Sequence, residues 1–147
     1  RCGQIHFPRL APAVIVRVVN DGRCLLARQP SFAPRLRSVL AGFAEPGESL
    51  EAAVAREVEE EVGLHLVSVS YAGSQPWPFP SSLMVGFTAE ADGDAIRVDA
   101  RELETAEWFT RARVRRQLRD ESLVLPSLKS IARQLIDDWL LAERERC

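Results

Sequence analysis

"GFAEPGESLEAAVAREVEEEVGL", from Gly42 to Leu64, is the stretch that decides the fold of this chain. Its spacing predicts a helix over residues 50–62. Ser49 is a typical N-cap residue, because its hydroxyl can accept a hydrogen bond from a free backbone N–H of the first turn. Gly63 fits the position just after a helix, where the backbone often takes a left-handed conformation.

The glutamates of this predicted helix fall on the side that should be buried. With Leu50 at 0° and about 100° per residue, the apolar stripe covers roughly 0–120°. It is formed by Leu50, Val54, Val58 and Val62. Glu57 falls near ~340° and Glu61 near ~20°, while Glu60 lies beside the stripe near ~280°. Three carboxylates therefore converge where apolar side chains are expected.

Such a cluster needs positive charge close by. Two ionised groups about 5 Å apart repel each other by about 3 kcal/mol at an effective dielectric constant of 20. Between Glu45 and Gly63 there are seven glutamates and one arginine. Divalent cations that prefer oxygen ligands, Mg²⁺ or Mn²⁺, are the predicted solution. The alternative is a solvated, charged helix face with an ion pair between Arg56 and Glu60.

The spacing of the charged residues resembles the signature of a known family. The series Gly42-x5-Glu48-x7-Arg56-Glu57-Val58-x-Glu60-Glu61-x-Gly63-Leu64 is similar, without a departure, to the Nudix box. This resemblance implies an α/β fold with a mixed β-sheet sandwiched between α-helices, an α/β/α arrangement. It also implies hydrolysis of a nucleoside diphosphate linked to another group.

The resemblance also implies roles for individual residues. The metal ligands would be Ala41 through its carbonyl, Glu57, Glu60, Glu61 and Glu102. Glu60 could instead be the general base. Arg56 would orient a glutamate, and Glu48 would tie the loop to the start of the helix. The implied catalytic set is Arg56, Glu57, Glu60 and Glu61, while Gly42 and Gly63 would serve the backbone geometry.

A second motif, "SQPWPFPSS", begins nine residues beyond this box. Its prolines and aromatic rings predict a stiff, non-repetitive loop, because proline removes a backbone donor and fixes φ. The motif resembles the signature of the NADH pyrophosphatase branch of Nudix enzymes. Aromatic rings stack on bases, and a stiff loop loses little entropy on binding. The implied substrate contacts are Ser81, Ser82, Gln75, Pro76, Trp77, Pro78, Phe79 and Pro80.

Further positions are similar to the same branch. Phe43 would stack on nicotinamide, and Ala132 in "SIARQLI" would contact the substrate through its backbone. Phe7 stands where tyrosine is usual, so a hydrogen bond from that position is in doubt. Cys2 would be the remnant of a zinc ribbon, which implies a boundary between a linker at residues 1–11 and a catalytic domain at 12–147. Structural Zn²⁺ is expected only in the full-length protein, since Zn²⁺ needs four ligands.

The rest of the chain indicates one domain of strands interleaved with two or three helices. Strands are expected at 12–20, 23–29, 38–43, 65–73, 82–90, 95–98 and 107–109. A loop is expected at 29–37, and a second amphipathic helix from Ser127 to about Arg144. The 147 residues carry a net charge of −2 and three cysteines. No apolar run is long enough for a membrane span. The wide cysteine spacing favours a reducing compartment, and a cytoplasmic location is expected.

The resemblance implies a metal-dependent pyrophosphatase that cleaves NADH or NAD⁺ into nicotinamide mononucleotide and AMP, as a homodimer. It also implies removal of 5′ NAD caps from RNA. Arg28, Arg35, Arg37 and residues 111–119 offer basic patches for RNA, although each could be an ordinary solvated surface. The alternatives are a broader dinucleotide or ADP-ribose hydrolase, and a Nudix module that senses NAD without turnover.

Overall fold

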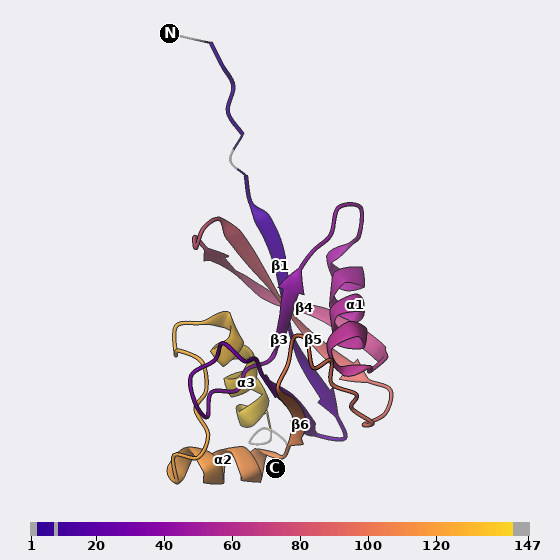
Figure 1. Cartoon of the computed structure of the whole chain (residues 1–147), viewed down its shortest axis with the longest axis vertical. Helices are drawn as coiled ribbons and strands as arrows, with labels where there is room; N and C mark the ends of the chain where they lie inside the picture. The colour runs from indigo at the N-terminus through magenta and orange to yellow at the C-terminus, as the bar shows by residue number, and fades with distance from the viewer. Residues whose placement is uncertain (1–2, 8, 143–147) are drawn as a thin grey trace.

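The computed structural model describes residues 3–7 and 9–142, and it contains six strands and three helices in the described part of the chain (Figure 1). In chain order these are β1 (Ala11–Asn20), β2 (Arg23–Arg28), β3 (Leu40–Phe43), α1 (Leu50–Val62), β4 (Leu66–Trp77), β5 (Ser82–Ala91), β6 (Thr105–Phe109), α2 (Arg111–Arg119) and α3 (Ile131–Leu141).

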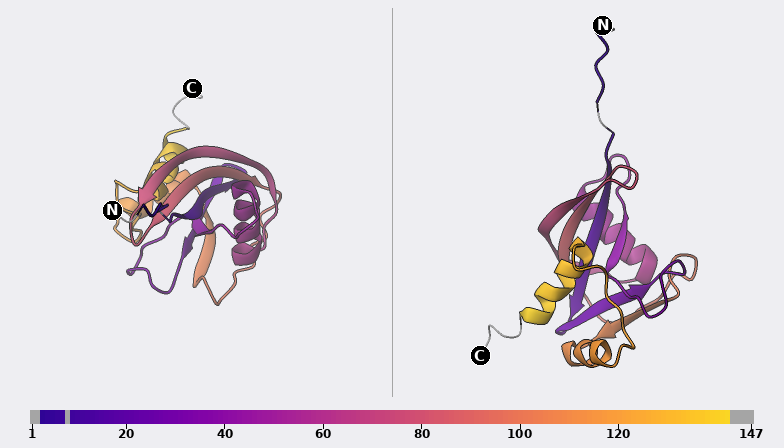
Figure 2. Two further views of the ribbon diagram at one scale, coloured as in Figure 1. Left: turned by 90° about the horizontal axis from the view of Figure 1, so that it is seen from above. Right: turned by 90° about the vertical axis from the view of Figure 1, so that its left-hand side faces the viewer.

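The sheet is mixed, and β1 is its centre. The strands follow the order β4-β5-β1-β2-β6, with β3 also paired to β1. The β1 and β5 strands run parallel, and the other pairs are antiparallel. One edge of β1 is shared, because its first half pairs with β3 and its last residues, Val19 and Asn20, pair with β2. A single antiparallel bridge between Ala27 and Ser38 links β2 to the segment just before β3. The sheet twists strongly (Figure 2).

The two faces of the sheet carry separate hydrophobic cores. Val14, Val16 and Val18 of β1 pack with the apolar side of α1. Ile15, which points to the opposite face, packs with α2 and α3. This alternation follows from the period of two along a strand. The predicted α/β/α arrangement is confirmed.

The ends of α1 were predicted correctly. The Ser49 hydroxyl accepts a hydrogen bond from the Ala52 N–H at 3.1 Å, and Gly63 has a φ of 68°. The predicted start of α3 at Ser127 was wrong by four residues. The helix begins at Ile131, because the Ser130 hydroxyl caps it by accepting from the Arg133 N–H at 3.2 Å. The predicted end near Arg144 lies outside the described residues.

Three other expectations need correction. The segment 74–77 is not a loop: it is the end of strand β4, paired with β5 from Ser74↔Val85 to Trp77↔Ser82. Proline is tolerated there because β4 is an edge strand. No strand forms at 95–98, all of which the structure describes. Residues 111–119, interpreted only as a basic patch, form helix α2.

Strand β4 is long and irregular. Its register with β5 shifts twice, between Leu66 and Ser68 and between Tyr71 and Gly73. These irregularities bend the strand, so that its second half curves toward the start of α3 (Figure 2). Within the described residues, no helix has the length and apolar character needed to span a membrane.

Candidate active site

Three carboxylates converge at one end of the sheet. Glu57 and Glu61 come from successive turns of α1, and Glu102 comes from the loop between β5 and β6. One carboxylate oxygen from each lies within 4.8 Å of the others. Glu57 is 9% exposed and Glu61 only 1%, as their position in the apolar stripe predicted. Glu102 is exposed and forms the open side of the cluster.

The loop that carries Glu102 is fastened to the end of α1. The Asp99 N–H donates to the Glu61 carbonyl at 2.9 Å, and the Arg97 N–H donates to the Val62 carbonyl at 2.8 Å. The Asp99 side chain then closes a tight turn by accepting from the backbone and the guanidinium of Arg101. The Glu102 N–H donates to the Asp99 carbonyl at 3.1 Å. These bonds place Glu102 opposite Glu61.

Burial and mutual repulsion disfavour ionisation of the two helical carboxylates. Burial raises the pKa of Glu61 to about 8, and the charges of Glu57, Glu102 and Glu60 add to this effect. Burial also raises the pKa of Glu57. Within the described part of the chain, Oε2 of Glu61 is buried and has no hydrogen-bond partner. A buried, unpartnered oxygen beside two further carboxylates fits a hard divalent cation.

Gly42 makes room for this cluster. A Cβ atom at Gly42 would overlap the carboxylate of Glu57. The strand β3 therefore approaches α1 closely only because residue 42 has no side chain. Ala41, whose carbonyl is a predicted ligand, precedes it in the same strand and lies opposite Ile15. The ligand role of Ala41 stays a prediction.

Arg56 hydrogen-bonds to the loop before α1 and to two glutamates of the helix, and its role in positioning them stays a prediction. Its guanidinium makes a bidentate pair with Glu48, at 2.7 and 3.1 Å. It also donates to the Phe43 carbonyl, to Glu57 at 3.0 Å and to Glu60 at 3.2 Å. The Arg56 guanidinium lowers the pKa of Glu48. Glu60 stays largely exposed beside these carboxylates. Its role as a ligand or as a base stays a prediction.

An apolar cavity of about 420 Å³ lies between β3, β4 and the start of α3. Four residues predicted to serve the site line it: Ala41, Gln75, Trp77 and Ala132. A much smaller cavity beside it contains Glu61 and shares three lining residues with it, Gln29, Phe32 and Val39. The acidic cluster and the apolar cavity are therefore neighbours. No sequence motif marks these three shared residues.

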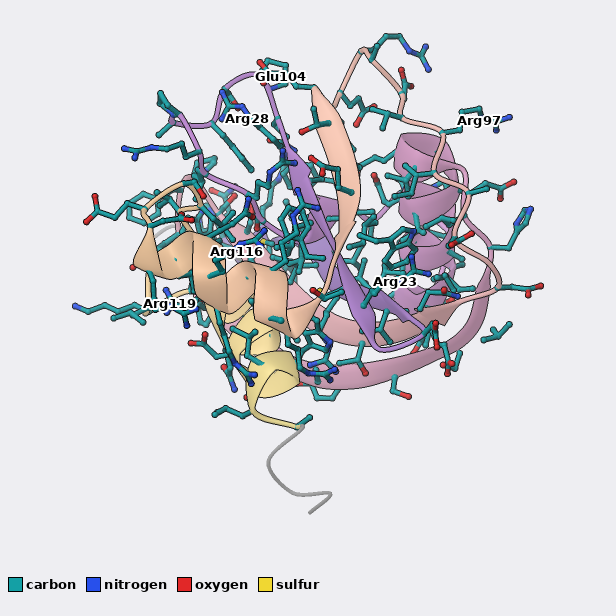
Figure 3. The ribbon with its side chains drawn as sticks, turned by 90° about the horizontal axis from the view of Figure 1, so that it is seen from below. Arg23, Arg28, Arg97, Glu104, Arg116 and Arg119 are labelled. Carbon is teal, nitrogen blue, oxygen red and sulfur yellow. The ribbon has the colours of Figure 1, made fainter. Side chains whose placement is uncertain are left out.

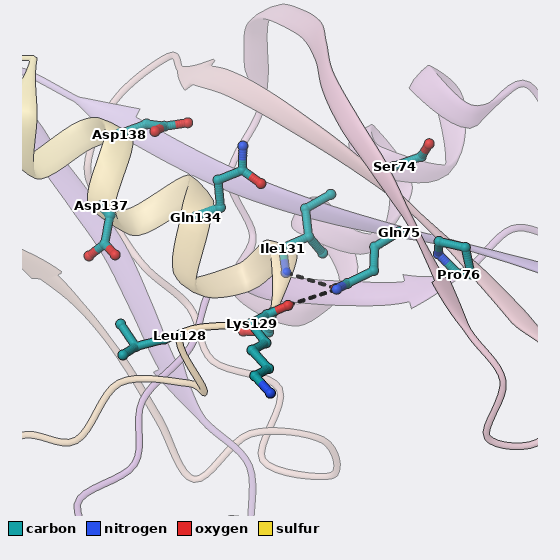
Figure 4. Close-up of a pocket in the computed structure, with 10 residues that line it drawn as sticks. Ser74, Gln75, Pro76, Leu128, Lys129, Ile131, Gln134, Asp137 and Asp138 are labelled. Carbon is teal, nitrogen blue, oxygen red and sulfur yellow. Dashed lines mark hydrogen bonds between the residues drawn. The ribbon is translucent and has the colours of Figure 1, made fainter.

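Gln75 connects β4 to α3, a role that the sequence did not indicate. Its side-chain N–H donates to the Lys129 carbonyl at 2.7 Å, and its oxygen accepts from the Ile131 N–H at 2.9 Å (Figure 4). The residue thus caps the first turn of α3. On the outer side of this bridge lies a polar hollow of about 410 Å³, lined by Lys129, Gln134 and Asp138 among others.

The remaining predicted substrate contacts are spread over the surface. Phe43 is 61% exposed and Phe79 75%. The Trp77 and Phe79 rings meet edge to face with centroids 5.9 Å apart. Pro76, Pro78 and Pro80 are exposed, Ser81 is half-buried and Ser82 is buried at the start of β5. Phe7 is 84% exposed, on an N-terminal segment that extends away from the sheet (Figure 1). Cys2 lies outside the described residues.

Comparisons with known proteins agree with this geometry. A sequence model of the NUDIX domain matches residues 9–129. The NAD-capped RNA hydrolase NudC of Stutzerimonas stutzeri is 49% identical over 139 residues, covering 95% of this chain and 48% of that protein. The NAD-capped RNA hydrolase NUDT12 of Homo sapiens is 48% identical over 139 residues, covering 91% of this chain and 30% of that protein. The chain spans about half the length of these curated relatives, or less.

Solved structures support the fold independently. The crystal structure of a NUDIX-family hydrolase from Clostridium perfringens matches with a TM-score of 0.68 at 16% identity, covering 91% of this chain and 99% of that one. A NUDIX hydrolase from Nitrosomonas europaea matches with a TM-score of 0.66 at 23% identity, covering 91% and 90%.

Proposed function

Because this chain belongs to the NUDIX domain family, we propose that it hydrolyses the diphosphate of NADH or NAD⁺, giving nicotinamide mononucleotide and AMP, and that it removes 5′ NAD caps from RNA. One observation carries the proposal: the carboxylates of Glu57, Glu61 and Glu102 converge, and Glu61 lines a small cavity that shares three lining residues with the apolar cavity of about 420 Å³. Relatives at 48–49% identity are named NAD-capped RNA hydrolases, which supports the proposed removal of NAD caps.

Each charged residue of the candidate site has a proposed role in hydrolysis of the diphosphate. Glu57, Glu61 and Glu102 would hold Mg²⁺ or Mn²⁺, with Glu60 as a further ligand or as the base that accepts the proton of the attacking water. The bound cation would neutralise charge on the diphosphate and lower the pKa of that water. Arg56 keeps Glu57 and Glu60 in place through its hydrogen bonds.

Recognition of the dinucleotide would depend on the aromatic side chains around the cavity. Trp77 lines the cavity and is 43% exposed, so its ring can stack on a base or on nicotinamide. Phe43, the last residue of β3, has an exposed ring, and so does Phe79, which meets the Trp77 ring edge to face. The amide of Gln75 already bonds to α3 with both its ends, so its contribution is to shape the cavity wall.

A variant of Glu61 tests the function. Wild-type protein with Mg²⁺ or Mn²⁺ should release AMP from NADH, and Glu61→Gln should abolish release while NADH still binds. Hydrolysis of NADH by Glu61→Gln at the wild-type rate would refute the proposal. Equal turnover of ADP-ribose and NADH would favour the broader hydrolase, and binding of NADH by the wild type without turnover would favour the sensing module.

Four further points concern the whole protein. We propose a homodimer, which the exposed Ile5, Phe7 and Leu10 of the N-terminal segment support; sedimentation would test it. The cytoplasmic location stays a prediction. The boundary after residue 11 also stays a prediction. The structural Zn²⁺ of the full-length protein stays a prediction too, because Cys2 lies outside the described residues.

A further inference from the structure

The charges of this chain are segregated between two regions of the fold. The segments 28–37 and 104–121, the second of which contains α2, together hold eight arginines and four carboxylates, a net charge of +4. Since the whole chain carries −2, the remaining residues carry −6. Helix α1, with the acidic cluster, and helix α2 lie on opposite faces of the sheet (Figure 1).

Most arginines of the basic region are engaged by neighbouring groups. Arg28 pairs with Glu104 at 2.7 Å. Arg37 and Arg113 both pair with Glu107 at 2.8 Å. Arg111 donates to the carbonyls of Gly22 and Trp139, and Arg115 donates to the carbonyl of Leu140. These side chains hold α2, β6 and α3 together.

Arg116 and Arg119 differ from these arginines in their exposure and in their contacts. Both are exposed, and the structure records no hydrogen bond or ion pair of their guanidinium groups with any described residue. They are three positions apart on α2, so they project from neighbouring turns (Figure 3). Hydrogen bonds from Ser122 lower the pKa of Asp120, and the nearby charges of Arg116 and Arg119 add to this effect.

A hydrogen-bonded strip connects this end of α2 to the apolar cavity. The Arg35 guanidinium donates to the Glu121 carbonyl at 2.7 Å, and the Val124 N–H donates to the Arg35 carbonyl at 2.9 Å. Leu36 and Pro126, next along the two segments, line the cavity. Six residues separate Arg119 from Pro126, a path of at most about 25 Å. Arg35 is exposed and lies between the two ends.

We propose that Arg116, Arg119 and Arg35 form a phosphate-binding surface for the RNA strand that continues from a dinucleotide bound in the cavity. The inference rests on the proposed function and names where the rest of that substrate lies. A polyanion complements a surface of exposed arginines in an otherwise acidic protein. Free NADH ends at its adenosine, whereas a capped RNA continues from that adenosine and supplies further phosphates for these arginines.

The test compares two substrates in one double variant. Arg116→Glu/Arg119→Glu should lower kcat/KM for a 20-nucleotide NAD-capped RNA by about tenfold or more at low salt, and should leave kcat/KM for NADH within about twofold. The slope of log kcat/KM for RNA against log salt concentration should become shallower by about 1.4, or 0.7 for each lost phosphate contact. Arg116→Lys/Arg119→Lys keeps the charge and should retain most of the RNA activity.

Arg97 supplies the matched control. It is also exposed, but it lies beside the end of α1, away from α2 (Figure 3). Arg97→Glu should leave the ratio of kcat/KM for the RNA to kcat/KM for NADH, and the salt slope, at their wild-type values. The proposal is wrong if the α2 double variant loses RNA and NADH activity equally, or if it loses neither.

A binding measurement separates this inference from the proposed function. Fluorescence anisotropy of a 5′-phosphorylated, uncapped RNA needs no turnover. Weaker binding by Arg116→Glu/Arg119→Glu than by Arg97→Glu supports the surface even if wild-type protein does not hydrolyse NADH. Equal binding by the two variants refutes the surface even if NADH is hydrolysed.

Discussion

Replacing Glu61 by glutamine should stabilise the metal-free protein at neutral pH, although it removes a proposed metal ligand. Folding raises the pKa of Glu61 from 4.5 to about 8. Between these values the folded state keeps a proton that the unfolded chain has released. The stability of the wild type therefore falls as the pH rises from about 4.5 to about 8. Glutamine has no proton to lose, so the variant escapes this decline.

The size of the effect follows from the pKa shift. A shift of one unit corresponds to about 1.4 kcal/mol, so the full shift corresponds to at most about 5 kcal/mol. At pH 7 the unfolded chain is ionised and the folded protein still largely protonated, which gives at most about 3 kcal/mol. Near pH 4 both states are protonated and the difference is close to zero. The stability gap should therefore widen by about 1.4 kcal/mol per pH unit between pH 5 and 7.5.

Urea unfolding in EDTA at several pH values measures this gap directly. Glu59→Gln is the matched control, because Glu59 lies on the same helix but is exposed. Saturating Mg²⁺ or Mn²⁺ should reverse the order, since only the wild type keeps all three carboxylates for the cation. A raised pKa of Glu61 is ruled out if Glu61→Gln is no more stable than the wild type at pH 7.5 in EDTA, or if the stability gap is equal at pH 5 and pH 7.5.

Four further variants, at three positions, test the residues that support the site. Gly42→Ala should weaken metal binding about 10- to 100-fold in calorimetric titration, because the new methyl displaces the carboxylate of Glu57; unchanged affinity would contradict the close approach. Asp99→Ala should weaken it about tenfold by loosening the turn before Glu102, and Asp99→Asn, which keeps an acceptor, should bind more tightly than Asp99→Ala. Gln75→Ala should lower the free energy of unfolding by about 1 kcal/mol by uncapping α3; an unchanged urea midpoint would exclude that role.

Much of the fold could be predicted because its signals are local. The two ends of α1 are set by Ser49 and Gly63, and its buried glutamates follow from helical spacing alone. The burial of Glu57 and Glu61 could therefore be predicted from the amino-acid sequence. Glu102 could be assigned only by family resemblance, because the turn at Asp99 that delivers it depends on contacts with the distant end of α1.

The errors arise where tertiary contacts override local preference. Helix α2 has one buried residue, Val114, so it shows almost no apolar periodicity, and arginine contacts fix it instead. The prolines of the second motif suggested a loop, but an edge strand accommodates Pro76. The bond between Gln75 and Ile131 joins residues 56 positions apart, which no local pattern reveals.

The two register shifts of β4 also bear on how the protein behaves at high concentration. An edge strand of twelve residues offers backbone groups that could recruit a strand from another molecule. The shifts interrupt the even spacing that such recruitment requires, since each one twists the strand away from a flat partner. The two register shifts that turn this edge toward α3 should therefore also disfavour fibrillar aggregation of the chain.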